Sequence, residues 1–197
     1  MSGSKQVPAA LLVVAVSLLS GCSAAAQGSP SGHASMHMSP GMDMSSMAGM
    51  DMSQPSPSQA ARMICGRETQ DAVKRTLQLD STPRPTHTWK NRVFTCTYRI
   101  GGRTLMMSVD DAQKDSVGAA YFANLRQSLP GARRIRGLEN FGFPAVQTAA
   151  GQVAFLKDGK SLLVDASDLA ARALPAGLSK EQAAYGVAAA VIACWTE

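Results

Sequence analysis

The hydrophobic and polar positions alternate most strictly over residues 93–109. Within VFTCTYRI (93–100) and RTLMMSV (103–109), every second residue is apolar or aromatic, which is the period of a strand with one buried face. Gly101 and Gly102 separate the two runs and form a two-residue turn typical of an antiparallel hairpin. That turn length sets three facing pairs of inward residues: Tyr98 with Leu105, Cys96 with Met107, and Phe94 with Val109.

A second hairpin is predicted over residues 152–166. Gln152–Leu156 and Ser161–Ala166 flank a turn at Asp158 and Gly159. The register of this hairpin gives two facing pairs: Phe155 with Leu162, and Val153 with Val164.

Apolar residues that recur with helical spacing predict a helix before the first hairpin, spanning residues 66–79. Val73 and Leu77 lie on its apolar face, and Pro83 and Pro85 stand beyond its end.

Two further helices follow the first hairpin and the second. One is capped by Asp115 or Ser116 and stops at Pro130. Its predicted buried residues are Val117, Tyr121, Phe122, Leu125 and Leu129. The last helix starts at Ser179, and Gln182 three residues later completes a capping box. Its predicted buried residues are Ala184, Val187, Ala188, Val191 and Trp195.

With a short strand expected at Ala145–Thr148, the element order over residues 60–197 is α-β-β-α-β-β-β-α. This order predicts an α+β fold: a single domain with an antiparallel sheet built from two hairpins, packed against about three helices that largely cover one face. The region is long enough to bury one hydrophobic core.

Residues 1–21 have the pattern of a bacterial export signal. Lys5 provides a positive start, and the apolar run Ala9–Leu19 is too short to span a bilayer as a lasting helix. The sequence Leu-Ser-Gly-Cys at 19–22 resembles the lipobox of bacterial lipoproteins, in which the cysteine is diacylated and becomes the new N-terminus. The resemblance implies lipidation at Cys22 and a location on the extracytoplasmic face of the bacterial cell membrane. The alternatives are an ordinary secreted protein and an uncleaved anchor.

Residues 22–59 are predicted to be a disordered tether between that anchor and the domain. Apart from its methionines, the segment consists mostly of Ala, Gly, Ser, Pro and Gln, and it has almost no branched aliphatic or aromatic residue. Such a composition cannot bury enough apolar surface to offset the entropy of ordering the chain.

Methionine is concentrated in this tether, where no core buries it. Seven of the chain's 11 methionines fall within residues 36–52, in M-x-M and M-x-x-M steps, and the pentapeptide GMDMS occurs twice. Thioethers are soft, neutral donors that favour Cu(I) and need no deprotonation. The predicted Cu(I) ligands are Met36, Met38, Met42, Met44, Met47, Met50, Met52, His33 and His37.

The tether resembles the Met/His-rich segments of extracytoplasmic copper-handling proteins, and that resemblance also implies copper binding. Calcium needs more oxygen ligands than Asp43 and Asp51 supply, and zinc needs more nitrogen or thiolate ligands than two histidines supply. The competing hypotheses are a low-complexity tether that drifted to methionine and a sacrificial oxidant sink.

Three cysteines remain besides Cys22. An exported domain lies where disulfides persist, and Cys65, Cys96 and Cys194 allow three different single bridges with one cysteine always left over. The leftover thiol is expected to be a buried, small apolar residue.

The segments MICGRET, TCTYRI, FLKDGKSLLVD and ACWTE together resemble small actinobacterial lipoproteins of unassigned role. The resemblance favours a Cys65–Cys96 disulfide, which pins the start of the first helix to the first hairpin. It brings no known activity with it.

The inventory of reactive residues predicts a protein that is not an enzyme. The domain has a single histidine, His87, in the Pro- and Thr-rich segment STPRPTHTWK, which is expected to be a loop. No nucleophile elbow or phosphate-binding glycine motif occurs. The carboxylate pairs Asp110/Asp111 and Asp165/Asp168 are expected to serve turns and caps.

The charge pattern excludes nucleic acid as the expected partner. The chain has a net charge of +5, and its densest basic spot is Arg126, Arg133, Arg134 and Arg136. No stacking aromatic residues lie among these arginines, so a solvated edge is the better interpretation.

Two functions remain open. One is a membrane-anchored, non-catalytic lipoprotein whose tether binds Cu(I), and the other is an envelope partner-binding or scaffold lipoprotein with an inert tether. Met107 should face inward and Met106 outward in the first hairpin. An exposed outer face would favour a copper site on the domain side, and a face packed by a helix would favour the second function.

Overall fold

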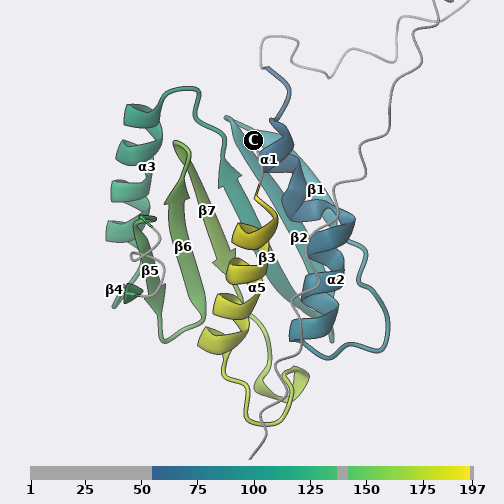
Figure 1. The fold of residues 1–197 in the computed structure, drawn as a ribbon. Helices are drawn as coiled ribbons and strands as arrows, with labels where there is room; N and C mark the ends of the chain where they lie inside the picture. The colour runs from purple at the N-terminus through teal and green to yellow at the C-terminus, as the bar shows by residue number, and fades with distance from the viewer. Residues whose placement is uncertain (1–54, 137–141, 196–197) are drawn as a thin grey trace, which may run out of the picture. The chain divides into compact units, whose positions relative to one another are not determined.

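A seven-stranded antiparallel sheet organises the domain (Figure 1). The computed structural model describes residues 55–136 and 142–195. The strand order is β1-β2-β3-β7-β6-β5-β4. The strands are β1 Thr86–Lys90, β2 Val93–Ile100, β3 Arg103–Asp110, β4 Arg133–Arg134, β5 Ala145–Thr148, β6 Gln152–Lys157 and β7 Lys160–Asp165.

Both predicted hairpins and their registers are confirmed. In the first hairpin Cys96 faces Met107, and in the second Phe155 faces Leu162. The two hairpins join through an antiparallel pairing of β3 with β7, where Met107 faces Val164. This pairing makes one continuous sheet and confirms the α+β fold class.

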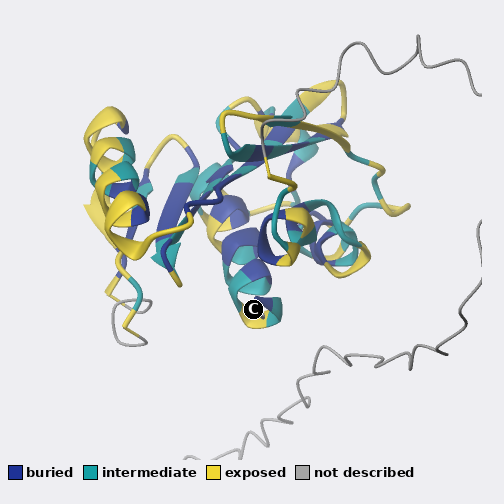
Figure 2. Cartoon of the chain, turned by 90° about the horizontal axis from the view of Figure 1, so that it is seen from above, coloured by how far each residue is buried: buried dark blue, intermediate teal, exposed yellow. Residues whose placement is uncertain are grey.

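Helices lie on both faces of the sheet. Among the described residues, the α-helices are α1 Gln59–Arg62, α2 Arg67–Thr76, α3 Asp115–Ser128 and α5 Lys180–Cys194, with 3₁₀ helices η2 Met63–Cys65 and η3 Ala171–Ala173. α1, α2 and α5 cover one face, here called the helix face, and α3 lies against the other (Figures 1 and 2).

The main core lies between the helix face and α1, α2 and α5. Its largest fully buried side chains include Tyr98, Phe155 and Leu105. A smaller cluster on the opposite face holds Phe122 and Leu129 from α3 and its flank against Val146 and Ala154. Burial of such large apolar side chains stabilises the fold by about 1.5–3 kcal/mol each.

The face opposite the helix face is covered over one hairpin and open over the other. α3 packs on β6 and β7, and no described helix covers the same side of β1, β2 and β3 (Figure 2). The side chains that alternate outward there form what we call the open face: Thr86, Thr88, Thr95, Thr97, Met106 and Ser108. Hydroxyl groups dominate its middle, and the exposed Lys90 and Arg99 alternate outward on the same side nearer its two ends, so it also carries positive charge.

The last helix matches its prediction closely. The Ser179 hydroxyl accepts a hydrogen bond from the Gln182 amide at 3.1 Å, and the Gln182 side-chain oxygen accepts one from the Ser179 amide at 2.8 Å. All five predicted core residues of this helix are buried.

The prediction for α3 was wrong in two respects. Val117 is 54% exposed, and the cap position is Lys114, which makes no side-chain capping bond. Gly118 faces the sheet instead, because a Cβ at that position would lie 1.7 Å from the Gly159 carbonyl oxygen. The close approach of helix to turn rotates Val117 towards solvent.

The prediction of a loop around His87 was also wrong. Thr86–Lys90 forms the edge strand β1, and His87 pairs with Cys96 of β2. β1 lacks the apolar alternation of a half-buried strand because four of its five side chains are exposed. Its backbone pairing with β2 makes it a strand.

Candidate functional site

The nine predicted Cu(I) ligands and Cys22 lie outside the described residues. The described residues nearest to these ligands in the sequence are those at which the tether joins the domain.

The tether joins the domain at a corner made by Pro57, Ser58, Arg92 and Asp111, which we call the entry corner. The Ser58 amide donates to Oδ2 of Asp111 at 2.6 Å, and the Arg62 guanidinium donates to the Pro57 carbonyl at 2.6 Å. The Arg92 guanidinium donates to the Asp111 carbonyl, and the Asp111 amide donates to the Arg92 carbonyl at 2.9 Å. These bonds fix the chain at residues 57–58 beside the end of β3.

Two carboxylates at this corner are buried. Asp111 is 1% exposed and Asp110 is 8% exposed. Burial raises the pKa of Asp110, and Asp111 raises it further, while the Arg92 guanidinium acts in the opposite direction. The nearby Tyr121 has a raised pKa because of burial and the charge on Asp110. The expected capping role holds for Asp111, which accepts the Ser58 amide.

Of the other two carboxylates, only Asp165 serves a turn, as expected, whereas Asp168 bonds to the start of β3. Asp165 accepts the Ser167 amide at 2.8 Å, and Asp168 accepts the Thr104 amide at 2.9 Å. Within residues 55–136 and 142–195, no group of three or more His, Cys, Asp or Glu side chains is arranged to hold a metal ion.

The Cys65–Cys96 disulfide is present, with Cα atoms 5.6 Å apart. It ties the end of η2 to the middle of β2. Tyr98, two residues along β2, donates its hydroxyl to the Ile64 carbonyl at 2.7 Å, and burial raises the pKa of this phenol. The disulfide and the tyrosine bond together attach η2 to the sheet.

The expectation of a buried free thiol at Cys194 was wrong. Cys194 is half-buried at the end of α5, and none of the described cysteines is a free thiol.

His87 lies exposed on β1, with its ring stacked on Phe94 at a centroid distance of 5.4 Å and an interplanar angle of 26°. Because residues paired across strands project on the same side, His87 points to the helix face, as its partner Cys96 does. Within the described part of the chain, no hydrogen bond or ion pair is found for its imidazole.

The two methionines of β3 lie as predicted. Met107 is fully buried in the core, and Met106 is half-buried on the open face beside Thr97 and Asp165. No described helix packs on Met106, which is the arrangement that favours the copper hypothesis over an inert tether.

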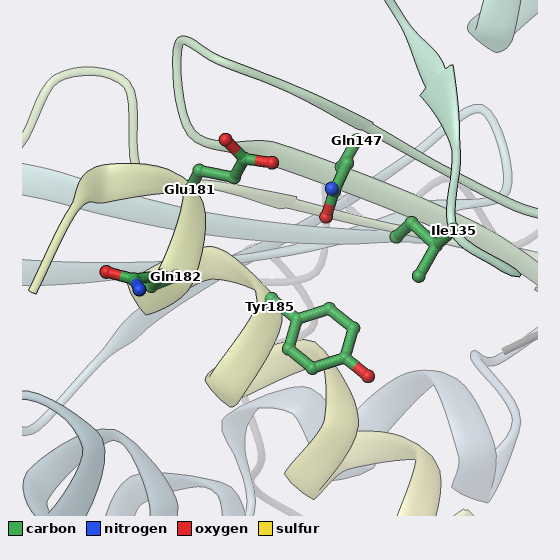
Figure 3. Close-up of a pocket in the computed structure, with 5 residues that line it drawn as sticks. All are labelled: Ile135, Gln147, Glu181, Gln182 and Tyr185. Carbon is green, nitrogen blue, oxygen red and sulfur yellow. The ribbon is translucent and has the colours of Figure 1, made fainter. Parts of the chain in front are cut away.

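A surface pocket of about 310 Å³ lies between β5 and α5 (Figure 3). Its lining residues are Ile135, Gln147, Glu181, Gln182 and Tyr185. Glu181 is already paired with Arg133, and Gln182 is used in the helix cap. The sequence did not reveal this pocket, because its residues come from three separate segments with no shared motif. Its size is at the lower end for small-ligand sites, about 300–1,000 Å³.

The basic spot is an exposed edge. Arg133 and Arg134 form the two-residue strand β4, and both are exposed. Arg133 is engaged by Glu181, so it is not available as an isolated anion-binding group.

Comparisons of this chain with protein-family models, with curated proteins and with solved structures find no match. Among the described helices, none has the length and apolar character needed to cross a membrane.

Proposed function

We propose that this protein is a non-catalytic lipoprotein, anchored through Cys22 on the extracytoplasmic face of a bacterial cell membrane, whose Met/His-rich tether binds Cu(I). The observation that carries the proposal is the placement of seven of eleven methionines within residues 36–52, ahead of the folded domain. Thioethers suit Cu(I) through their softness and neutrality.

The Cys65–Cys96 disulfide supports the proposed compartment. Disulfides persist in oxidising surroundings outside the cytoplasm. In such surroundings thiols are lost to oxidation into disulfides, whereas thioethers remain available as soft ligands. A methionine-based site is therefore the chemically suitable choice for holding Cu(I) there.

The entry corner gives the domain a part in this function. Residues 57–58 are held by Asp111 and Arg62. A lipid on Cys22 would hold the other end of the tether. With both ends held, the tether's ligands would stay near the membrane surface.

An anaerobic Cu(I) titration against a chromophoric chelator tests the copper proposal. The protein is residues 22–197, which retains every described core residue, with Cys22→Ser and Cys194→Ser so that no cysteine outside the Cys65–Cys96 disulfide can bind Cu(I). Ascorbate keeps the copper reduced without attacking the Cys65–Cys96 disulfide. We expect stoichiometric uptake that is lost when the seven tether methionines become Ser. Equal, weak uptake by both proteins would refute copper binding.

Mass analysis of Cys22 in protein extracted from membranes tests the anchor. We expect residues 1–21 to be absent and Cys22 to carry acyl chains. An intact signal segment, or Cys22 in a disulfide with Cys194, would contradict the lipoprotein assignment.

A second candidate function, a docking module for an envelope protein, would use the open face as its binding surface. A photocrosslinking residue at Thr97 tests it in living cells, with the same residue at the exposed Arg75 of α2 as control. A specific crosslinked partner at position 97 alone would support docking, and its absence would leave the copper proposal as the better account.

A further inference from the structure

The helix face of the sheet is left partly uncovered at the edge formed by β5 and β4. α5 packs mainly on β6 and β7, and it meets β5 only along one side (Figure 1). The pocket between β5 and α5 lies at this edge and has a volume of about 310 Å³. A space of this size can hold a small molecule.

Gln147 is a polar side chain on the helix face of this edge. It pairs with Val153, which pairs with Val164, and residues paired across strands project on the same side. Both valines are fully buried, whereas Gln147 is half-buried and lines the pocket. Within residues 55–136 and 142–195, no hydrogen bond is found for its side-chain amide. Since a polar group withdrawn from water is normally paired, this amide is suited to bind a molecule in the pocket.

Tyr185 supplies an aromatic ring on the α5 side of the pocket. It is 36% exposed, and the only other exposed large hydrophobic side chain among the described residues is Val117. Figure 3 shows the Gln147 amide and the Ile135 side chain extending from the sheet edge towards α5, which carries the Tyr185 ring. A ring that is exposed beside a pocket offers a surface on which an apolar face of a ligand can pack.

The two charges beside the pocket cancel. The Arg133 guanidinium donates to Oε1 of Glu181, so this ion pair presents no net charge to a ligand. In the described part of the chain, Oε2 of Glu181 and the side-chain NH₂ of Gln182 make no hydrogen bond. They add one acceptor and one donor on the α5 side. The pocket therefore suits an uncharged molecule with several hydroxyl or amide groups better than an ion.

An N-acetylated amino sugar has the groups that match this lining. The apolar C–H face of its ring can pack on Tyr185, and its acetamido methyl group can pack against Ile135, which is only 6% exposed. The Gln147 amide can donate to the acetamido carbonyl and accept from a neighbouring hydroxyl. Further sugar hydroxyls can donate to Glu181 and accept from Gln182.

We propose that the pocket between β5 and α5 binds an N-acetylated amino sugar, with Gln147 bonded to its acetamido group and Tyr185 packed on its ring. The site goes beyond the proposed function, because it lies within the domain, uses no methionine and needs no copper. Such a sugar can be a single molecule or one unit of a glycan strand, since both present the same ring and acetamido group.

An NMR titration with N-acetylglucosamine tests the site. The protein is residues 22–197 carrying Cys22→Ser and Cys194→Ser, without copper. We expect saturable binding, with shifts of the Gln147 side-chain NH₂ resonances and the Tyr185 ring resonances. Glucose lacks the acetamido group, and glucosamine carries a cation in its place. Both should bind at least about 10-fold more weakly.

Two substitutions test the named contacts. Gln147→Glu keeps the size of the side chain but removes the NH₂ donor, and it should weaken binding by about 10-fold. Tyr185→Ala should weaken binding by about 10-fold through loss of the ring contact. Val117→Ala is the matched control, because it truncates the other exposed large hydrophobic side chain, on α3, and it should leave the affinity unchanged. An unchanged urea midpoint shows that each variant is folded.

The linear dimer of N-acetylglucosamine and insoluble cell-wall glycan identify the source of the sugar. Binding of both supports a glycan strand as the ligand, and binding of the monosaccharide alone supports a free sugar. The inference is overturned by no saturable binding of N-acetylglucosamine, by equal binding of glucose, or by binding that survives both Gln147→Glu and Tyr185→Ala. All these measurements are made without copper, so such a result would not affect the proposed function.

Discussion

The two central hairpins share one sheet and one core, yet they differ in how many of their faces are covered. β6 and β7 are packed by α5 on the helix face and by α3 on the other. β2 and β3 are packed on the helix face alone, and their outward side chains are Thr95, Thr97, Met106 and their neighbours on the open face. The sequence reflects this difference, because β2 alternates strictly whereas β6 carries the apolar run VAFL. A strictly alternating hairpin in this fold thus indicates a face that the rest of the described domain leaves uncovered.

The largest predicted difference in the free energy of unfolding is between two Asp substitutions, one in each hairpin. Both lie on the side of the sheet opposite the helix face. Thr95 and Ala154 lie in the same row of the sheet, through Ser108 and Leu163, but Ala154 is fully buried under α3. Ala154→Asp should lower the free energy of unfolding by about 3–5 kcal/mol, because the carboxylate is buried unpaired. Thr95→Asp should change it by less than about 1 kcal/mol. Urea unfolding measures both, and equal losses would show that the open face is covered after all.

The next largest loss of stability is expected for the Cys65–Cys96 disulfide. Among the described residues, it is the only covalent link between the hairpin of β2 and β3 and the elements on the helix face. Replacing Cys65 and Cys96 together by Ala should cost about 2–4 kcal/mol, since the bridge closes a loop with a sequence separation of 31. Thermal unfolding with and without the change measures it. A loss no greater than that of Thr95→Asp would mean that the Tyr98–Ile64 bond and core packing already hold η2 in place.

The smallest change in stability is expected at Asp110, which lies at the end of β3 near Tyr121 of α3. Burial raises its pKa above the ordinary value of 3.8, so the folded state holds this proton more tightly than the unfolded state does. Stability is therefore lost as pH rises from the unfolded value through the raised folded value. Asp110→Asn should stabilise the protein at pH 7 and lose this advantage as pH falls towards 4. A variant less stable than the parent at pH 7 would show that Arg92 more than offsets the burial.

The sequence predicts those parts of the fold for which a single physical pattern is enough to determine the element. Alternation and two-residue turns determined both hairpins with their registers, and the Ser179–Gln182 capping box located the start of α5. β1 was missed because an exposed edge strand needs no apolar residues. Val117 was assigned to the core because spacing alone cannot show that Gly118 permits the closest approach to a turn.

The candidate site was less predictable than the fold. The methionine-rich composition of the tether indicates thioether ligands. It does not show where those ligands lie relative to one another or to the domain. The segment around His87 predicts a loop, and only the pairing of His87 with Cys96 reveals that this histidine lies in the edge strand β1. The Cys65–Cys96 pairing was favoured by resemblance, since the residues alone left three pairings open.

X-ray absorption at the copper edge tests the central claim most directly, using the protein loaded with one equivalent of Cu(I). We predict a first coordination shell dominated by sulfur, which disappears when the seven tether methionines are replaced by Ser. A shell of nitrogen and oxygen only, or a sulfur shell that survives those replacements, would contradict a copper site in the tether.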